Sequence, residues 1–339
     1  MSDPSKGTMR TRTVLATTAL LLCLSGCAGA SPSSAESPAT PTSSGADFPV
    51  TITSCGRELT FDKAPSRVLM LSGTGAAIMD ELGVLDTVVA HAGRKRFGEA
   101  AGDLDRRVDA IPALDSVEGE TGGAQVSTEA VLSVEPDLVM GFDTGVQVEA
   151  LAAAGVPVYS PAAFCPDYDV KRADWSLVDN EFEQVAGIFG VRDRLPEVLA
   201  GLHAQVQGLK PAGIADGTTA AALYVTPGST TFYAYGTSSM VQPIMEAVGL
   251  TNAYGTSTER VFDTTMETLL ALDPEWLVLL PNEASDEAAR QTLRSFPGSE
   301  QLRAVREGHV VVLPFALTDP PSSLSVRGAV ELSKAVSGA

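Results

Sequence analysis

Two stretches of this sequence match each other, and their match decides the expected fold. The first reads Glu129-Ala-Val-Leu-Ser-Val-Glu-Pro136-Asp-Leu-Val, and the second reads Glu267-Thr-Leu-Leu-Ala-Leu-Asp-Pro274-Glu-Trp-Leu-Val. Each places a glutamate seven residues before a proline, with apolar residues at helical spacing between them. An acidic residue stands on both sides of each proline, and an apolar run typical of a buried strand follows. The chain therefore carries an internal repeat, with one copy in each half.

Further matching elements surround each copy of the repeat. A short apolar run, a glycine-containing loop, a helical pattern and a closing pair of an apolar residue and glycine (Leu82-Gly83 and Val248-Gly249) occur at 67–83 and again at 220–250. Strand and helix patterns alternate through both regions, which is typical of parallel or mixed sheets that are covered on both faces. We therefore expect two similar α/β lobes, an N-terminal one over residues 48–173 and a C-terminal one over residues 211–339.

The stretch between the two regions differs in kind. Residues 174–210 hold almost no strand pattern, and apolar residues recur there at three- and four-residue intervals, which favours a helix. Gly190 and Pro196 are the points at which such a helix would kink. The fold class expected from the sequence is α/β, with two similar lobes joined by one long linker helix and a ligand groove between the lobes.

The beginning of the chain has the pattern of an export signal. Arg10 and Arg12 precede an apolar run at 14–23, which is too short to cross a bilayer. The run ends in Leu-Ser-Gly-Cys27, which is similar to a lipobox, the signal in which the cysteine thiol takes a diacylglyceryl group. Cys27 is therefore the expected lipidation site, because two or more acyl chains hold a protein stably at a membrane.

The residues after this cysteine complete the expected anchor. Residues 28–47 are almost entirely Ser, Pro, Ala, Thr and Gly, a composition that cannot bury a core and is typical of a flexible tether. With residues 1–27 as a lipoprotein signal peptide, the sequence predicts a chain held by lipid at the extracytoplasmic face of the cell membrane. An ordinary secretory signal with a chance cysteine is the alternative, and Met9 is an alternative start of translation.

Charge and cysteine content narrow the function further. Asp and Glu outnumber Lys and Arg by 42 to 23, and the formal net charge of −19 disfavours nucleic acid as a partner. Once the signal peptide is removed and Cys27 is lipidated, Cys55 and Cys165 remain. An exported protein usually bridges two such cysteines, and a pair of buried free thiols is the alternative.

These features occur together in an order that resembles a known family. The lipobox, the Pro65-Ser-Arg-Val-Leu69 stretch, the two Glu-to-Pro segments and the linker pattern are similar to the helical-backbone class of periplasmic-type substrate-binding lipoproteins. These proteins serve ABC importers of ferric siderophores, haem and cobalamin, and the resemblance covers about residues 48–336. It implies a monomer that holds its ligand between two lobes and delivers it to a permease dimer. A bridge between Cys55 and Cys165 matches a feature of the actinobacterial branch.

The resemblance also implies a role for the glutamates of the repeat. The family places one glutamate on the outward tip of each lobe, where it docks into an arginine-containing pocket of a permease subunit, and Glu129 and Glu267 match these positions. Ordinary helix chemistry is the alternative, because Ser and Thr residues precede both glutamates as possible N-caps and the helix dipole favours an acid in the first turn. The recurrence in both halves favours docking.

The expected cargo is a ferric siderophore, with haem and cobalamin as alternatives and a protein-binding lipoprotein as a further one. Ligand contacts are expected from loops at strand ends, where arginines and aromatic rings would suit a ferric chelate. The candidate contacts are Thr74, Arg94, Arg96, Phe142, Tyr233, Tyr235 and Phe315. Tyr233 and Tyr235 share one strand face, so one of them can belong to the core, and 94–96 can be a solvated loop. The small residues of 72–77 leave room in the groove.

An enzyme is not expected. The sequence contains no nucleophile elbow, zinc-protease helix or phosphate loop. Its three histidines, His91, His203 and His309, are too widely spaced in the sequence to indicate a metal site, and two cysteines without nearby histidines make a poor zinc site. We therefore expect no cofactor and no metal held by the protein itself.

Overall fold

The structure is a computed structural model that describes residues 48–73, 75–93, 102–118, 124–141, 145–209, 213–281 and 285–338. All of these residues belong to one unit, Gly45–Ala339. The predicted signal peptide with Cys27 and the predicted tether lie outside the described residues. Four of the predicted groove residues lie outside them as well, namely Thr74, Arg94, Arg96 and Phe142.

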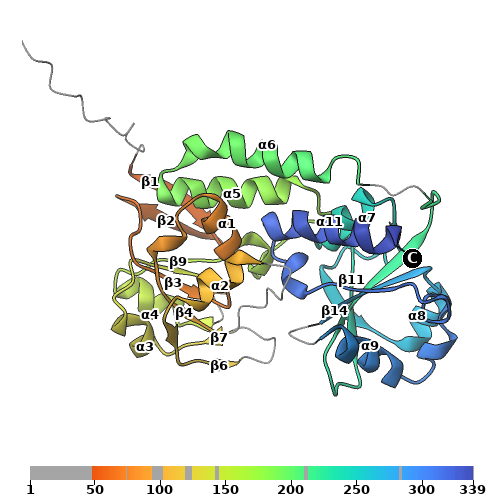
Figure 1. Ribbon diagram of the computed structural model, residues 1–339. Coiled ribbons are helices and arrows are strands. Elements are labelled where there is room, and N and C mark those ends of the chain that lie inside the picture. Colours follow the sequence, from red (N-terminus) through yellow and green to blue (C-terminus); the bar gives the residue numbers. More distant parts are fainter. Residues whose placement is uncertain are drawn as a thin grey trace, which may run out of the picture. The chain divides into compact units, whose positions relative to one another are not determined.

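The N-terminal lobe consists of an antiparallel hairpin and a five-stranded parallel sheet of order β5-β4-β3-β8-β9 (Figure 1). Its strands are β1 (Val50–Ser54), β2 (Arg57–Phe61), β3 (Val68–Leu71), β4 (Val88–Ala92), β5 (Ala113–Leu114), β8 (Leu138–Met140) and β9 (Val158–Tyr159), with a small hairpin of β6 (Val117–Glu118) and β7 (Ala124–Gln125). Its helices are α1 (Ala76–Glu81), α2 (Asp103–Asp109), α3 (Thr128–Ser133) and α4 (Val148–Ala153), with short 3-10 turns η1 (Leu85–Thr87) and η4 (Ala162–Phe164).

The C-terminal lobe has a six-stranded mixed sheet in which β13, β11, β10, β14 and β15 are neighbours in that order and β12 also pairs with β10. Its strands are β10 (Thr219–Val225), β11 (Phe232–Tyr235), β12 (Thr251–Asn252), β13 (Val261–Thr264), β14 (Trp276–Pro281) and β15 (Val310–Val312). Its helices are α7 (Val241–Ala247), α8 (Met266–Leu272), α9 (Asp286–Ser295), α10 (Arg303–Glu307) and α11 (Ser323–Ser337), with 3-10 turns η6 (Ser299–Gln301) and η7 (Phe315–Leu317). The predicted fold class of two α/β lobes is therefore confirmed.

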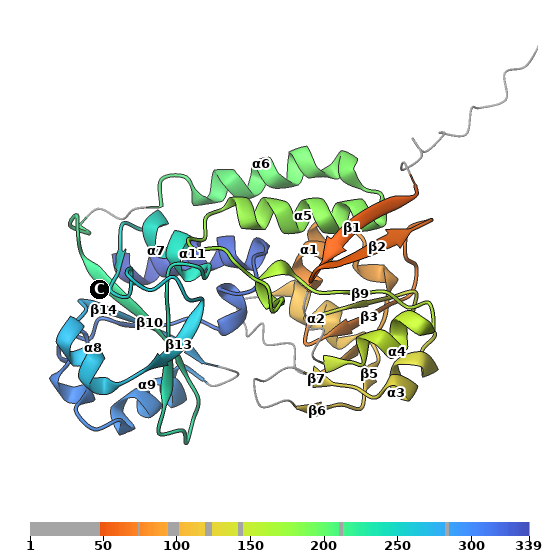
Figure 2. The same cartoon turned by 180° about the vertical axis from the view of Figure 1, so that it is seen from behind.

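The prediction of a single linker helix over residues 174–210 is wrong in one respect, because two helices occupy this stretch. They are α5 (Ser176–Phe189) and α6 (Leu195–Val206), separated by the 3-10 turn η5 (Arg192–Arg194). Gly190 ends α5 in the left-handed conformation, with φ of 65° and ψ of 32°, which glycine adopts without the penalty that a Cβ brings. Pro196 lies in the first turn of α6, where a missing N–H costs nothing. The chain thus folds back, and α6 lies along α5 in both views (Figures 1 and 2).

The connection between the lobes crosses more than once as a result. After β9 the chain reaches the C-terminal lobe, where the Tyr168 hydroxyl donates to the Ser238 carbonyl at 2.8 Å and the Ala173 N–H donates to the Thr237 carbonyl at 2.7 Å. Helix α5 then packs against β1 and α1 of the N-terminal lobe. Helix α6 begins beside that lobe and packs against α11 of the other lobe. The lobes are therefore joined by the extended segment between β9 and α5 and by the two antiparallel helices α5 and α6.

Both sheets are buried on their two faces, which explains why their central strands are continuous apolar runs in the sequence. In β3, Val68 and Met70 belong to the largest hydrophobic core, whereas Leu69 and Leu71 belong to a second core on the other face. Strand β14 alternates in the same way between the largest core and a third core. The largest core therefore includes one face of each sheet and also the apolar face of α5, so it is continuous through both lobes.

The repeat contains residues with internal structural roles. In the N-terminal lobe the Asp137 carboxylate accepts hydrogen bonds from the Ser66 N–H at 2.8 Å and the Arg67 N–H at 2.8 Å. The Arg67 guanidinium in turn donates to the carbonyls of Val134 and Glu135 at the end of α3. These bonds fix the start of β3 to the end of α3, which is the physical reason for the Ser-Arg pair and for the acid after the proline.

The second copy of the repeat makes an equivalent junction. The Glu275 carboxylate accepts from the Thr219 N–H at 3.4 Å, and the Glu275 N–H donates to the Thr219 hydroxyl at 3.2 Å, which joins the starts of β10 and β14. The Arg303 guanidinium donates to the Asp273 carbonyl at the end of α8 at 3.2 Å. In both lobes, therefore, an acid after the proline and an arginine from elsewhere fix the end of the repeat helix.

The two glycines of the helical hairpin should respond in opposite ways to alanine substitution. Gly190→Ala places a Cβ at positive φ and should lower the free energy of unfolding by about 1–2 kcal/mol. Gly201 lies inside α6 with open space around its Cβ position, so Gly201→Ala should raise this free energy by about 0.5–1 kcal/mol. Urea unfolding of the domain from residue 46 onward measures both, and equal effects of the two substitutions would contradict the turn assigned to Gly190.

Candidate functional site

A pocket lies between the lobes, at the carboxyl ends of β3, β9 and β15. Parallel α/β sheets commonly place ligands at this edge, because the loops that follow the strands converge there. The N-terminal lobe contributes small residues after β3, namely Ser72, Gly73, Gly75 and Ala77, as well as Tyr159, Pro161 and Phe164. The C-terminal lobe contributes Phe315, Ala316, Asp319 and the Pro-Pro-Ser segment that follows, and α5 contributes Glu181 and Val185.

The loop after β3 has a backbone that its sequence requires. Gly75 has φ of 84°, and a Cβ there would lie 2.2 Å from the Met140 sulfur, so a larger side chain does not fit. Ser72 also has positive φ, and its hydroxyl accepts a hydrogen bond from the Ala124 N–H at 3.0 Å. The small residues of this loop thus bring the backbone of the N-terminal lobe close to the pocket, in agreement with the room expected there.

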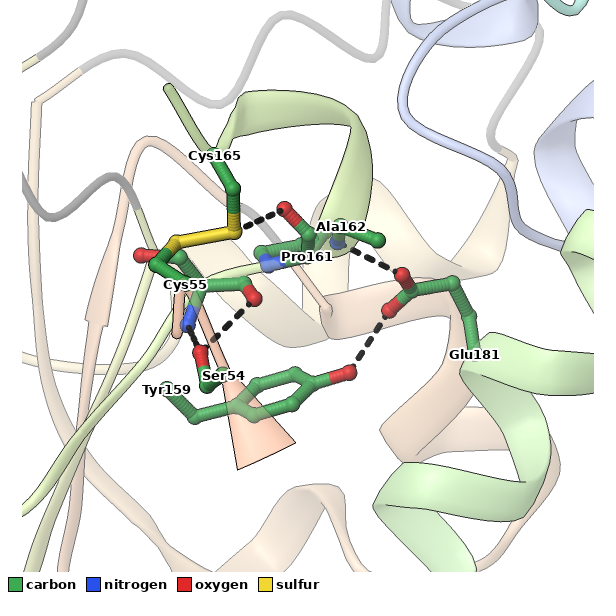
Figure 3. The surroundings of a disulfide bond; sticks show 8 residues. Ser54, Cys55, Tyr159, Pro161, Ala162, Cys165 and Glu181 are labelled. Carbon is green, nitrogen blue, oxygen red and sulfur yellow. Dashed lines mark hydrogen bonds between the residues drawn. A yellow bond between two sulfur atoms is a disulfide. The ribbon is translucent and has the colours of Figure 1, made fainter. Parts of the chain in front are cut away.

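Glu181 of α5 is the buried acid of the pocket. Its carboxylate accepts hydrogen bonds from the Tyr159 hydroxyl at 2.7 Å and from the Ala162 N–H at 2.8 Å (Figure 3). Burial raises the pKa of Glu181 to about 7, although both hydrogen bonds act in the opposite direction. The same burial, followed by the nearby Glu181 charge, raises the pKa of Tyr159 well above its ordinary value. Glu181 therefore ties α5 to the segment that follows β9.

A disulfide between Cys55 and Cys165 holds the same segment from its other side (Figure 3). The predicted bridge is thus confirmed. It joins the β1–β2 turn to the end of η4, and the Ser54 hydroxyl reinforces the junction. That hydroxyl donates to the Ser160 carbonyl at 3.0 Å and accepts from the Ser160 N–H at 2.9 Å. The bridge closes a sequence separation of 110 residues, which in the chain-entropy description stabilises the folded state by about 4–5 kcal/mol.

Three aromatic rings form a cluster on the C-terminal side. The ring centroids of Tyr224 and Tyr233 are 6.4 Å apart, and Tyr224 meets Phe315 edge-on at 5.8 Å. Tyr233 keeps 40% of its surface exposed, and Phe315 lines the pocket. Tyr235, which was also a predicted contact, is buried in the largest core and offers no surface to a ligand. Of the predicted ligand contacts that the structure describes, Phe315 lines the pocket, and Tyr233 is linked to Phe315 through the ring of Tyr224.

An arginine that the sequence analysis missed lies beside this pocket. Arg260 pairs with the buried Asp319 at 3.2 Å, and its guanidinium lies 5.6 Å from the centroid of the Phe164 ring. Since Phe164 belongs to the N-terminal lobe and Asp319 to the C-terminal lobe, Arg260 bridges the two. The Asp319 carboxylate of this pair also acts on Tyr168: burial, followed by the negative charge of Asp319, raises the pKa of the Tyr168 hydroxyl above its ordinary range. The sequence around Arg260 carries no periodicity or motif that would have identified it.

Glu181 was also missed, but a signal for it exists in the sequence. Val178, Phe182 and Val185 are apolar residues at helical spacing, and Glu181 falls on the face that they define. A charged residue on the apolar face of a helix requires an internal partner, because an unpaired buried charge is costly. This reasoning would have marked Glu181 as a buried, hydrogen-bonded acid, though not its position at the pocket.

The two glutamates of the repeat are exposed, and each lies in the first turn of a capped helix. The Ser127 hydroxyl accepts from the Ala130 N–H at the start of α3, and the Thr265 hydroxyl accepts from the Thr268 N–H at the start of α8, both at 3.1 Å. Within the described ranges, the side chains of Glu129 and Glu267 form neither a hydrogen bond nor an ion pair. Helices α3 and α8 belong to different lobes, and both lie away from α5 and α6 (Figure 1).

Metal ligands do not gather in the part of the chain that the structure describes. No group of three or more His, Cys, Asp or Glu residues there could hold a metal ion. The imidazole of His203 bonds Asp179 at 2.8 Å, and that of His309 stacks on Trp276 with ring centroids 4.4 Å apart. The described helices also include none with the length and apolar character needed to cross a membrane.

Glu181 should make the stability of the protein depend on pH. Its pKa is about 7 when folded and near 4.5 when exposed, so between these values the folded state keeps a proton that the unfolded state has lost. The free energy of unfolding should therefore fall as pH rises from about 5 to about 7, by roughly 3 kcal/mol at about 1.4 kcal/mol per pKa unit. Urea unfolding at pH 5 and pH 8 measures this loss, and Glu181→Gln should remove most of it. An unchanged pH dependence in that variant would contradict the assignment.

Comparison with known proteins agrees with this architecture. A family model described as periplasmic binding protein matches residues 68–317. The chain is similar to an ABC-type Fe3+-hydroxamate transport system protein from Saccharomonospora viridis, with 34% identity, a TM-score of 0.76, and coverage of 85% of this chain and 99% of that chain. No curated protein matches the chain.

Two more distant structures share the fold alone. A petrobactin-binding protein from Bacillus subtilis is 16% identical, with a TM-score of 0.61 and coverage of 85% of this chain and 97% of that chain. A periplasmic haem-binding protein from Pseudomonas aeruginosa is 20% identical, with a TM-score of 0.62 and coverage of 81% and 94%. The family model spans most of this chain, and the alignment with the Saccharomonospora protein covers nearly all of that protein. This chain therefore belongs to the periplasmic binding protein family.

Proposed function

We propose that this chain is the extracytoplasmic capture component of an ABC importer and that its cargo is a ferric siderophore. The observation that carries the proposal is the pocket between the lobes, with the aromatic cluster of Tyr224, Tyr233 and Phe315 and with Arg260 beside it. A ferric siderophore presents oxygen edges around the metal and apolar arms outside it. Arginine and tyrosine donors suit the former, and aromatic rings suit the latter.

The resemblance to the Saccharomonospora protein supports the same cargo class. That structure is named for Fe3+-hydroxamate transport, and its sequence identity and TM-score are higher than those of the other two structures described above. A haem ligand would need an axial donor to its iron, commonly a histidine or a tyrosine. The three histidines do not line the described part of the pocket, and the tyrosine that does, Tyr159, is buried and donates its hydroxyl to Glu181, which makes haem the weaker proposal.

Attachment to the membrane through lipid on Cys27 is part of the proposal. The apolar run, the Leu-Ser-Gly-Cys27 stretch and the tether of residues 28–47 support it. A diffusing capture protein would be lost from a cell with no outer membrane, whereas an anchored one stays near its permease. On this view the domain from residue 48 acts as a monomer that is tethered beside a permease dimer.

Removing the exposed ring of the aromatic cluster should weaken ligand binding. Tyr233→Ala should lower the affinity for a ferric trihydroxamate by about tenfold, since contact with an aromatic ring is worth on the order of 1 kcal/mol or more. Leu272→Ala is the control, because Leu272 is also 40% exposed but lies on α8. Calorimetry with iron-loaded and iron-free hydroxamate, haem and cobalamin measures the affinities. Preference for haem or cobalamin would change the cargo, and no binding at all would contradict solute capture.

Reversing the charges of the repeat should stop delivery without affecting capture. Glu129→Arg with Glu267→Arg should reduce uptake of the loaded ligand to background, because like charges would then face the permease arginines. Glu287→Arg is the control, since Glu287 is an exposed acid in the first turn of the capped helix α9. Uptake of radioactive iron by whole cells and ligand affinity by calorimetry are the two measurements. An equal loss of uptake in the control, or a loss of affinity in the double variant, would falsify the docking role.

A further inference from the structure

Glu181 is the charged residue of the described pocket wall that has no charged partner in the described part of the chain. That wall contains two acids, Glu181 and Asp319, and no lysine, arginine or histidine. The Asp319 carboxylate is balanced by the Arg260 guanidinium at 3.2 Å. Glu181 instead has two uncharged partners, the Tyr159 hydroxyl and the Ala162 N–H. The described wall therefore carries a net negative charge when Glu181 is ionised.

The Glu181 carboxylate can accept more hydrogen bonds than its two partners supply. A carboxylate offers about four lone-pair sites and no donor. Here Oε1 accepts from the Ala162 N–H and Oε2 accepts from the Tyr159 hydroxyl, so each oxygen keeps a site for a further donor (Figure 3). Glu181 is only 4% exposed but lines the pocket, so a ligand in the pocket is well placed to supply that donor.

The surroundings of Glu181 strengthen any interaction with a charged ligand. Much of the remaining wall is apolar, and its larger side chains are those of Ile78, Phe164, Val185, Phe315 and Leu324. Charges attract and repel one another more strongly in such a setting than in water. The carboxylate therefore favours a ligand with a protonated amine, with which it can form a charge-assisted hydrogen bond. It disfavours a ligand that brings a further negative charge.

We propose that Glu181 selects the ligand by charge and that the cargo is an iron chelate with a protonated amine, which this carboxylate binds. The inference rests on the proposed function and narrows it. A ferric trihydroxamate is neutral at its metal centre, because three singly charged hydroxamates balance Fe3+, so an amine on its chain makes the complex a cation. A ferric tricatecholate is an anion and is disfavoured beside the same wall. Glu181 thus contributes to specificity as well as to the tie between α5 and the segment after β9.

Three linear ferric trihydroxamates that differ only at one chain end test the proposal. One has a free amine, the second an N-acetyl group and the third an N-succinyl group, so their net charges are positive, zero and negative. Calorimetry on the full chain in mild detergent measures their affinities at pH 8, where the amine is protonated and Glu181, whose pKa burial raises to about 7, is ionised. The amine form should bind about tenfold more tightly than the acetyl form, and the succinyl form about tenfold more weakly.

The variant Glu181→Gln separates an effect of charge from an effect of structure. Its amide oxygen can accept from the Ala162 N–H while its NH2 group donates to the Tyr159 hydroxyl, so both ties to the segment after β9 are kept. The affinities of the three ligands should become nearly equal in this variant. Glu183→Gln is the matched control, because Glu183 is an exposed acid on the same helix, and the order of affinities should remain in that variant.

The outcomes distinguish this inference from the function on which it rests. The predicted order in the original chain, lost in Glu181→Gln and kept in Glu183→Gln, supports it. Equal binding of all three ligands, or an order that Glu181→Gln leaves unchanged, overturns selection by charge and leaves siderophore capture standing. Binding of none of the three overturns capture of this siderophore class and the inference with it. The order has to appear in the original chain, so the proposal is tested even where a variant fails to fold.

Discussion

The packing of α5 into a core that both lobes share is the constraint on which the rest of the structure depends. Phe182 and Val185 of α5 are buried in the same core as Met70 of β3 and Val278 of β14. A protein interior is packed as densely as an organic crystal, so such a core resists bending at its middle. Separate cores would leave the lobes free to rotate about a linker. The shared core instead holds the two walls of the pocket at a defined separation.

The position of Glu181 follows from the same packing. A carboxylate on the buried face of α5 has to find internal donors, and it finds them in Tyr159 and the Ala162 N–H. The segment after β9 is thereby held by hydrogen bonds on one side and by the Cys55–Cys165 disulfide on the other. This segment carries the Phe164 ring that Arg260 meets from the other lobe. A buried carboxyl group and a covalent bond therefore hold the same few residues of the pocket wall in place.

The sequence predicted the features that depend on local patterns. The repeat, the two lobes and the pairing of Cys55 with Cys165 follow from periodicity and cysteine arithmetic. The turn at Gly190 was only partly predicted, because glycine is compatible with both a kink and a left-handed helix end, and the choice depends on the tertiary packing of α6 on α5. Tyr235 illustrates the same limit, since alternation placed it on one face with Tyr233 but could not show which of the two the largest core buries.

The pocket was the least predictable part, because its residues come from distant segments. Arg260 acquires its role only through Asp319 and Phe164, which lie 59 residues after it and on the other lobe, respectively. No pattern in the sequence around any one of the three indicates the other two. Contacts between residues of different lobes depend on the tertiary structure of the whole domain. Sequence patterns mainly indicate the local structure of residues that are close together in the chain.

Comparison of the two copies of the repeat distinguishes residues that form bonds within the protein from the two first-turn glutamates, whose side chains form none in the described part of the chain. The proline ends a helix in each copy, and the acid after it bonds the beginning of a central strand. Helix stability requires only some acid in the first turn, and α9 meets this requirement with Asp286 and Glu287. In α3 and α8 the first turn holds a single acid, and it is the glutamate at the same distance from the proline. A partner with two equivalent subunits would need a charge that recurs at matching positions, so the recurrence supports the docking role proposed for these glutamates.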